Sequence, residues 1–80
     1  ELKSASNTVK HGIDFIEAQQ LWNDPNYLQV PAITKGEPRL MVIGKINEQH
    51  WSAIITPRDN RIRIISVRRS RTKEVEAYEN

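Results

Sequence analysis

The sequence predicts a single small α+β domain, in which two helices precede an antiparallel sheet and one helix follows it. Helix signals gather in the first 25 residues and again after residue 70, whereas runs rich in β-branched residues fill the middle of the chain. Short turns separate these runs, which is typical of a meander of antiparallel strands. Helices that are segregated from such strands indicate the α+β class.

The first helix is predicted near the start of the chain. Leu2, Ala5 and Val9 lie at helical spacing, so they are expected to form the buried stripe of a short amphipathic helix. Gly12 is expected to end this helix, because glycine readily adopts the left-handed conformation found just beyond a last helical turn.

The second helix is predicted from its capping residues. Asp14 is a suitable N-cap, and Glu17, three residues later, completes the spacing of a capping box. Residues 23–25, Asn-Asp-Pro, are expected to stop the helix, because the residue before a proline disfavours helical backbone. The buried stripe of this helix is expected to consist of Phe15, Ala18 and Trp22.

The strands are predicted from runs of apolar residues between turns. Residues 27–33 form the weakest candidate, and Pro31 places it at a sheet edge because proline cannot donate a ladder hydrogen bond. Residues 34–38 are expected to form a loop. Three stronger candidates follow at residues 40–46, 50–56 and 61–67, with turns at 47–49 and 57–60. In 40–46, apolar residues of both parities predict burial on both faces of the strand.

The final helix is expected to begin at Ser70 or Thr72, with Glu74 near its positive end. Val75 and Tyr78 are its expected anchors.

Composition narrows the class of protein. The 80 residues are expected to form one domain, 1–80, without cysteine and therefore without disulfides or thiolate metal sites. No run approaches the ~20 apolar residues that cross a bilayer, so no membrane partner is expected. The absence of cysteine is compatible with the cytoplasm, where we expect the chain to act.

The basic residues are concentrated near the end of the chain. Residues 58–73 hold seven of the twelve Lys and Arg residues, although the net charge is only +2. Arg61 and Arg63 occupy alternate positions of a predicted strand and therefore share a face. Guanidinium groups on a rigid strand are well suited to binding phosphates. The charges alone favour phosphate binding no more than the alternative, in which these arginines lie on a solvated sheet face or pair with acidic side chains.

Other chemistry-bearing residues are scattered through the chain. Lys10 and His11 end the first helix, where they either bind phosphate and move a proton or simply offset the helix dipole. Glu37 and Arg39 lie two residues apart where a strand begins, so their side chains could project from the same face. They form either part of a site or a surface ion pair. The remaining candidates are Arg58 in a turn, Arg68 and Arg69 at a strand end, and Tyr78. No metal constellation or phosphate-binding glycine loop stands out, and we expect no cofactor.

Four stretches in order resemble one known family. They are Asn7-x-x-Lys10-His11-Gly12-Ile13-x-Phe15-x-x-Ala18, Asn23-Asp24-Pro25, Glu37-x-Arg39-x-x-x-Ile43-Gly44, and Thr56-x-Arg58-x-x-x-Ile62-Arg63-Ile64-Ile65-Ser66-x-Arg68-Arg69 followed by Glu74 and Tyr78. This set is similar to the BrnT family of toxins from type II toxin–antitoxin systems, over nearly the whole chain.

The resemblance implies a RelE-like fold, a metal-independent endoribonuclease activity, and a partner antitoxin with a ribbon-helix-helix DNA-binding domain. It also implies that toxin and antitoxin together bind their operator DNA, the toxin only through the antitoxin. The catalytic residues that the resemblance implies are Lys10, His11, Glu37, Arg39, Arg58, Arg68, Arg69 and Tyr78. From the basic segment itself we expect Arg61, Arg63 and Arg71 to bind RNA.

The chain departs from the family pattern at both ends. Family members usually begin with a short extra strand, which this sequence lacks, and their final helix is often rich in arginine where this one has Val75, Glu76 and Ala77. We expect Lys10, His11, Arg39, Arg58 and Arg68 to converge on one concave surface if the chain cleaves RNA. The alternative is a non-catalytic module that uses the arginine-rich strand to bind RNA or a protein.

Overall fold

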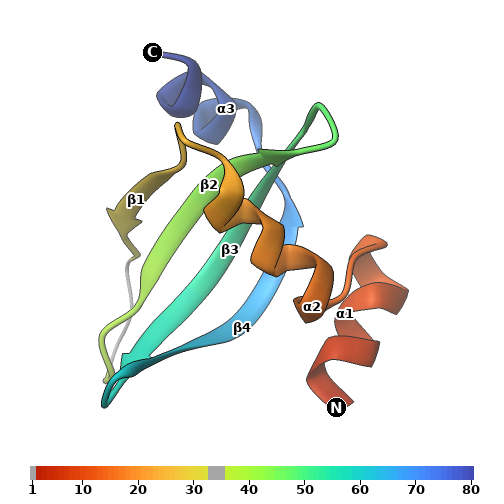
Figure 1. Ribbon diagram of the computed structural model, residues 1–80, viewed down its shortest axis with the longest axis vertical. Helices are drawn as coiled ribbons and strands as arrows, with labels where there is room; N and C mark the ends of the chain where they lie inside the picture. The colour runs from red at the N-terminus through yellow and green to blue at the C-terminus, as the bar shows by residue number, and fades with distance from the viewer. Residues whose placement is uncertain (1, 33–35) are drawn as a thin grey trace.

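The computed structural model describes residues 2–32 and 36–80 and has the predicted α+β architecture (Figure 1). In chain order, its elements are α1 (Leu2–His11), α2 (Phe15–Ala18), the 3₁₀ turn η1 (Gln19–Asn23), β1 (Leu28–Pro31), β2 (Leu40–Ile46), β3 (Gln49–Arg58), β4 (Arg61–Arg69) and α3 (Thr72–Glu79). The strands form one antiparallel sheet in the order β1-β2-β3-β4, which confirms the meander. The predicted end of the first strand at residue 33 and the start of the loop after it lie outside the described residues.

The two predicted helix signals are confirmed in detail. Gly12 has a φ of 80°, and its amide donates to the Thr8 carbonyl at 2.8 Å, as expected of a left-handed residue that ends a helix. The Asp14 side chain accepts from the Glu17 amide at 2.7 Å, and the Glu17 carboxylate accepts from the Asp14 amide at 3.4 Å. The reciprocal capping box therefore fixes where α2 begins.

Two of the three residues predicted to form the buried stripe of α1 are not buried, and the side chain of the third, Leu2, lies outside the described part of the structure. Ala5 is exposed and Val9 is 87% exposed, whereas the polar residue Asn7 is buried. The Asn7 amide group donates to the carbonyls of Ile13 and Val67 at 2.8 Å, and its oxygen accepts from the Val67 amide at 3.0 Å. Asn7 thus binds the backbone at the outer edge of β4, so α1 attaches to the sheet through hydrogen bonds that the hydrophobic pattern did not reveal.

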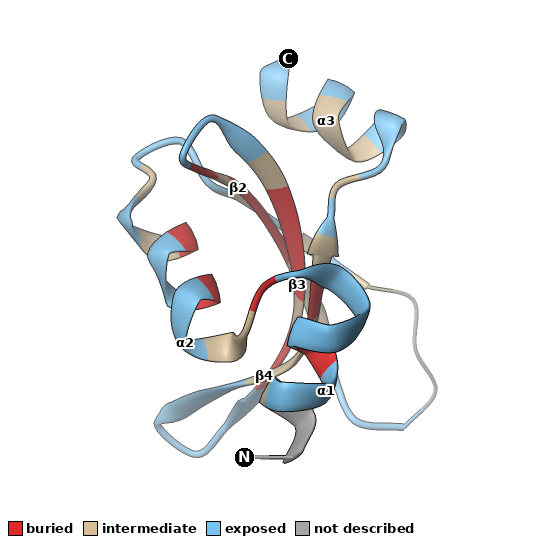
Figure 2. Cartoon of the chain, turned by 90° about the vertical axis from the view of Figure 1, so that its right-hand side faces the viewer, coloured by how far each residue is buried: buried red, intermediate tan, exposed pale blue. Residues whose placement is uncertain are grey.

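The core lies between the sheet and the layer formed by α2 and η1, where Figure 2 shows buried residues on facing sides. Ala18 of the predicted helical stripe is fully buried, and Phe15 and Trp22 pack at the margin. Leu21, which the stripe omitted, is fully buried because the 3₁₀ turn changes the periodicity after Ala18. The buried core residues are Ile13, Ala18, Leu21, Val42, Ile46, Trp51, Ala53, Ile55 and Val67.

The last two hairpin strands are longer than predicted. The turn between them is reduced to Asp59 and Asn60, so Arg58 is the last residue of β3 and does not belong to the turn. Asp59 has a φ of 53°, a conformation that suits such a tight connection. Arg68 and Arg69 likewise belong to β4, whose end was placed at residue 67 by sequence.

A β-bulge in β4 decides which arginines share a face. Ile54 pairs with Ser66 and Ile55 pairs with Ile64, so Ile65 is an extra residue in the ladder. Simple alternation from Arg61 and Arg63 would place Arg69 on their face. The inserted residue reverses the alternation and places Arg68 there instead, opposite Ser52 of β3.

The final helix lies on the opposite side of the sheet from α2 (Figure 2). Its N-cap is Arg71 and not Ser70 or Thr72, because the Glu74 carboxylate accepts from the Arg71 amide at 2.9 Å. The two expected anchors, Val75 and Tyr78, are only half-buried, and no residue of α3 is fully buried. Polar contacts therefore contribute much of what holds α3 in place.

Candidate functional site

The sheet face that points away from α2 carries most of the candidate residues. Its register places Arg58, Arg61 and Arg63 at one end and Arg68 near the other. We call the first group, together with Glu37 and Arg39, the open arginine cluster. The residues that α3 covers at the other end, Ser52, Arg68, Ser70 and Glu74, are called the helix-covered cluster. The two clusters share one face but differ in what neutralises their charge.

In the open arginine cluster, the carboxylate of Glu37 forms ion pairs with two guanidinium groups. Oε1 of Glu37 lies 3.7 Å from Nη2 of Arg39, and its Oε2 lies 3.4 Å from Nη2 of Arg58. The side chains of Glu37 and Arg39 are each 39% exposed, and that of Arg58 is 58% exposed. Ion pairs this exposed contribute only about 0–1 kcal/mol each. The groups are therefore free to exchange partners with a ligand at little cost in stability.

The backbone around Glu37 is tied to the sheet by a buried hydroxyl. Oγ1 of Thr56 donates to the carbonyl of Pro38 at 2.8 Å, and Thr56 is 1% exposed. This bond fixes the segment that carries Glu37 and Arg39 beside β3, whose end carries Arg58. Nε of Arg39 is buried and has no hydrogen-bond partner among the described residues. A buried donor without a partner is energetically unfavourable.

Arg61 and Arg63 extend the cluster along β4. Arg61 pairs with Arg58 across the hairpin, and Arg63 pairs with Thr56, which places all these side chains on one face. Both arginines are exposed, and neither forms an ion pair within residues 2–32 and 36–80. Like charges placed opposite each other repel, so a polyanion on this face is stabilised by relieving that repulsion.

In the helix-covered cluster, the charge of Arg68 is already neutralised. Its Nη1 and Nη2 donate to the two carboxylate oxygens of Glu74, each at 2.8 Å. Oγ of Ser52 also donates to Glu74, at 2.8 Å, and lies 2.7 Å from Oγ of Ser70. The hydrogen bonds from Arg68, above all, lower the pKa of Glu74 to about 2, against the opposing effect of burial. Arg68 is thus part of a closed bidentate pair and is not a free cation.

The hydroxyl of Tyr78 is also already bound to a carboxylate. It donates to Oδ2 of Asp24 at 2.6 Å, which raises the pKa of Tyr78 to about 12. Burial acts to raise the pKa of Asp24, but hydrogen bonds from Tyr78 and from the amides of Asn26 and Lys45 outweigh it and lower that pKa. A phenol whose proton is shared with a carboxylate is a poor proton donor. The contact instead fastens α3 to the segment after η1.

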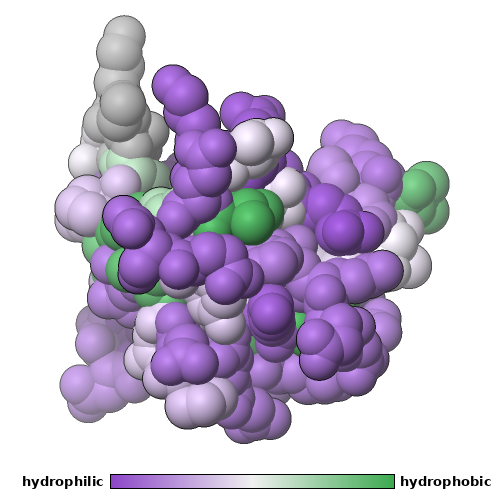
Figure 3. All heavy atoms as spheres, turned by 90° about the horizontal axis from the view of Figure 1, so that it is seen from above, coloured by the Kyte–Doolittle hydropathy of each residue, from purple (hydrophilic) through white to green (hydrophobic). Residues whose placement is uncertain are grey.

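The end of α3 makes a further polar contact with the sheet. Nε2 of His50 lies 2.6 Å from Oε2 of Glu79, and Nζ of Lys45 lies 3.7 Å from the same oxygen. The hydrogen bond from His50 lowers the pKa of Glu79. Seen from this end, the surface is mostly hydrophilic (Figure 3). Two carboxylates of α3, Glu74 and Glu79, therefore bind donors and cations of the sheet, and between them Tyr78 donates to Asp24.

The remaining candidates lie elsewhere. The guanidinium of Arg69 lies 5.5 Å from the centre of the Trp51 ring, on the face that carries the core. Arg71 caps α3. Lys10 and His11 are exposed at the end of α1, and their side chains make no hydrogen bond or ion pair within the part of the chain that the structure describes. The structure brings together Glu37, Arg39 and Arg58, and does not connect them by any such contact to Lys10, His11 or Tyr78.

Sequence reasoning missed several polar residues of this face. Asp24 was interpreted as part of a helix stop, yet it accepts three hydrogen bonds. Ser52 and His50 lie in an apolar strand and carried no signal of their own. Alternation along β3 from Arg58 identifies both, because residues 50, 52 and 58 have the same parity.

Within residues 2–32 and 36–80, no group of three His, Cys, Asp or Glu side chains has the geometry to hold a metal ion. No described helix combines the length and hydropathy needed to cross a membrane.

Comparison with known proteins identifies one family. The model of the ribonuclease toxin BrnT, of type II toxin–antitoxin systems, matches residues 1–74 of the 80-residue chain. A comparison with curated proteins gives no match. The match spans most of the chain, and the chain therefore belongs to the BrnT family of ribonuclease toxins.

Proposed function

We propose that this BrnT-family toxin is a metal-independent endoribonuclease and that its open arginine cluster holds the RNA phosphate at which cleavage occurs. The observation that carries this proposal is the position of Glu37, whose two carboxylate oxygens face Arg39 and Arg58. A proton acceptor that lies between two phosphate-binding groups matches what RNA cleavage requires. The same face continues into Arg61 and Arg63, which suits a strand with several phosphates.

The chemistry follows from the substrate. Each ribose of RNA supplies its own nucleophile, the 2′-hydroxyl. Glu37 takes the proton of that hydroxyl as the bond from O2′ to phosphorus forms, and Arg39 and Arg58 stabilise the charge on the phosphoryl oxygens. The bond from phosphorus to O5′ then breaks, and O5′ receives a proton. The products are a 2′,3′-cyclic phosphate and a 5′-hydroxyl end.

The other candidate residues receive different roles in this proposal. His11 and Lys10 contact the RNA from the end of α1, and His11 is the residue we propose to protonate O5′. Arg69 and Arg71 add cationic contacts. Arg68 acts as a positioning residue through Glu74, and Tyr78 fastens α3 because its hydroxyl is already bound to Asp24.

We also propose that a ribbon-helix-helix antitoxin neutralises this activity in the cytoplasm and carries the toxin to operator DNA. Type II toxin–antitoxin systems use a protein antitoxin, and the exposed guanidinium groups of Arg61 and Arg63 favour a partner with acidic segments. Such attraction acts mainly on the association rate and weakens with salt.

A second candidate function is RNA binding without cleavage. It is favoured by one observation: His11 makes no contact with the open arginine cluster among the described residues, so no proton donor stands beside Glu37. Binding would then depend on the arginines alone.

The test is incubation of the purified chain with bulk RNA in EDTA, followed by analysis of the fragment ends. Cleavage with 2′,3′-cyclic phosphate and 5′-hydroxyl ends is expected, and Glu37→Gln is expected to abolish most of it. Glu76→Gln is the matched control, because Glu76 is exposed on α3. RNA that is bound but stays intact favours the second candidate.

A further inference from the structure

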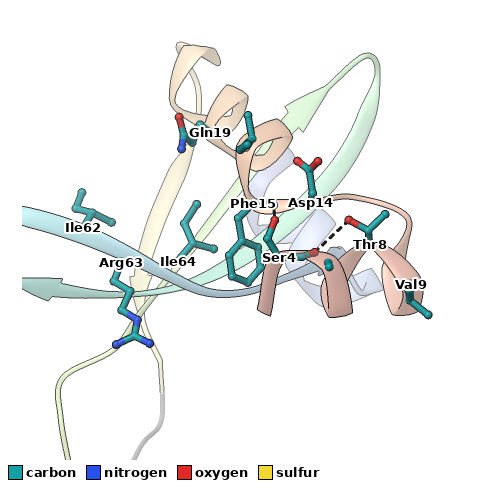
Figure 4. Close-up of a pocket in the computed structure, with 11 residues that line it drawn as sticks. Ser4, Thr8, Val9, Asp14, Phe15, Gln19, Ile62, Arg63 and Ile64 are labelled. Carbon is teal, nitrogen blue, oxygen red and sulfur yellow. Dashed lines mark hydrogen bonds between the residues drawn. The ribbon is translucent and has the colours of Figure 1, made fainter. Parts of the chain in front are cut away.

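An apolar groove lies beside β4, at the edge of the sheet, and its lining includes Arg63 of the open arginine cluster. It is bounded by α1, the start of α2 and the first half of β4, and has a volume of about 760 Å³ (Figure 4). Its lining includes Val9 of α1, Phe15 and Ile16 of α2, and Ile62 and Ile64 of β4. Figure 4 shows Phe15 of α2 beside Ile64 of β4, with Ile62 farther along the strand and Arg63 pointing to the other side of it.

The groove gathers most of the apolar surface that the fold leaves uncovered. Four large hydrophobic residues are exposed among the described residues, and three of them line it: Val9 at 87%, Ile16 at 74% and Ile62 at 54% exposure. Single exposed hydrophobic residues are ordinary, but a contiguous group marks an interaction surface. Tyr27, the fourth, lies outside the groove.

The groove also explains why the buried stripe of α1 was predicted wrongly. Ala5 and Val9 have the spacing of a buried helix face, yet both line the groove and are exposed. The helix is instead held by hydrogen bonds from Ser4, whose Oγ accepts from the Phe15 amide at 2.9 Å, and by Asn7. A helix face with an apolar pattern that the domain itself does not cover is suited to a partner.

Charge around the groove indicates the chemistry of that partner. Two charged residues line it, Asp14 and Arg63. The Asp14 carboxylate is occupied by the cap of α2, so Arg63, exposed at the rim, carries the available charge. Ile62 and Ile64 face the groove from β4, and Arg63 between them lines its rim, whereas Arg61 pairs with Arg58 and is not among the lining residues. A chain that fills the groove therefore passes beside cations of the open arginine cluster.

We infer that this groove is the docking site for an amphipathic segment of the protein antitoxin, with apolar side chains in the groove and acidic ones toward Arg63. The inference rests on the proposed function for its partner, because a type II system supplies a protein that must restrain the ribonuclease. A segment docked here and continued around β4 covers the arginines from the edge of the sheet.

The test is co-purification of the chain with the protein encoded by the neighbouring open reading frame, followed by titration calorimetry. Ile16→Asp and Ile62→Asp are each expected to weaken binding by roughly tenfold or more, because a charge would enter an apolar contact. Tyr27→Asp is the matched control and is expected to change affinity by less than about twofold. Circular dichroism checks folding, and Ile16→Ser and Ile62→Thr replace any variant that unfolds.

Two outcomes would overturn the inference. Groove variants that bind the antitoxin as tightly as the parent chain exclude the site. Variants that turn a dimer of the chain into a monomer, at unchanged antitoxin affinity, assign the groove to a second copy. The RNA assay distinguishes failure of this inference from failure of the proposed function. Without antitoxin, the groove variants are expected to cleave RNA like the parent chain. A parent chain that never cleaves RNA would contradict the proposed function alone.

Discussion

The two clusters on one sheet face show how the same residue type can serve different purposes. Arg58 is 58% exposed and meets Glu37 at 3.4 Å, whereas Arg68 is 23% exposed and makes two bonds of 2.8 Å with Glu74. An exposed pair is weak and exchangeable, and a covered bidentate pair is strong and structural. We therefore propose ligand binding for the open arginine cluster, whereas the contacts of the helix-covered cluster anchor α3.

The largest effect is expected from the carboxylate of the open arginine cluster. Glu37→Gln keeps the size of the side chain but removes its ability to take a proton. The rate of RNA cleavage is expected to fall by roughly 10²–10⁴-fold, with little change in the midpoint of thermal unfolding. A cleavage assay and a melting curve on the same preparation check both parts. A variant that cuts RNA at the parent rate would remove Glu37 from the chemistry.

Glu74→Ala, in contrast to Glu37→Gln, is expected to act mainly on stability. This change removes the acceptor of Arg68, Ser52 and the Arg71 amide, and leaves a half-buried guanidinium without its partner. Loss of such charge-assisted bonds is expected to lower the free energy of unfolding by about 1–3 kcal/mol. Urea denaturation measures it, with Glu76→Ala as the exposed control in the same helix. Equal stability of the two variants would show that the helix-covered cluster is not structural.

The fold was largely predictable from local signals, and the division between the clusters was not. Gly12 and the Asp14 capping box define helix ends within a few residues, and such features are visible in sequence. The Glu74–Arg68 pair joins residues on different elements, and the bulge at Ile65 changes which arginines share a face. Neither follows from spacing along one strand, because both depend on pairing between strands and helices.

The same limit applies to buried polar residues. Asn7 is not part of the apolar stripe predicted for the first helix, yet it is buried and binds the edge of β4 sixty residues away. Arg68 lies beyond the apolar run of its predicted strand, and its place in the sequence gives no sign of the bidentate pair that joins it to Glu74 of α3.

A pH titration of stability sharpens the comparison. The pKa of Glu74 is lowered from 4.5 to about 2 in the folded protein, so the folded state favours the ionised carboxylate. Its contribution is therefore fully present above pH 4.5 and is lost as the pH falls toward 2. The free energy of unfolding of the parent chain is expected to decrease over this range more steeply than that of Glu74→Gln. Parallel curves would contradict the role given to the pair.

The smallest effect is expected from a single exposed arginine of the open arginine cluster. Arg61→Ala removes one phosphate contact, so the slope of log affinity against log salt is expected to decrease by about 0.7 for single-stranded RNA. Fluorescence anisotropy with a labelled RNA at several salt concentrations measures it. An unchanged slope would place Arg61 outside the RNA-binding surface.

Paired measurement of Arg58→Ala and Arg68→Ala tests the division between the two clusters most directly. For each variant, RNA affinity and the free energy of unfolding are measured in the same buffer. Arg58→Ala is expected to lose RNA affinity and keep its stability, whereas Arg68→Ala is expected to lose stability. Any loss of RNA cleavage by Arg68→Ala should be recovered at temperatures where it remains folded. The result that would contradict the account is the reverse: a stable Arg68→Ala chain that no longer binds RNA, beside an Arg58→Ala chain that binds it normally.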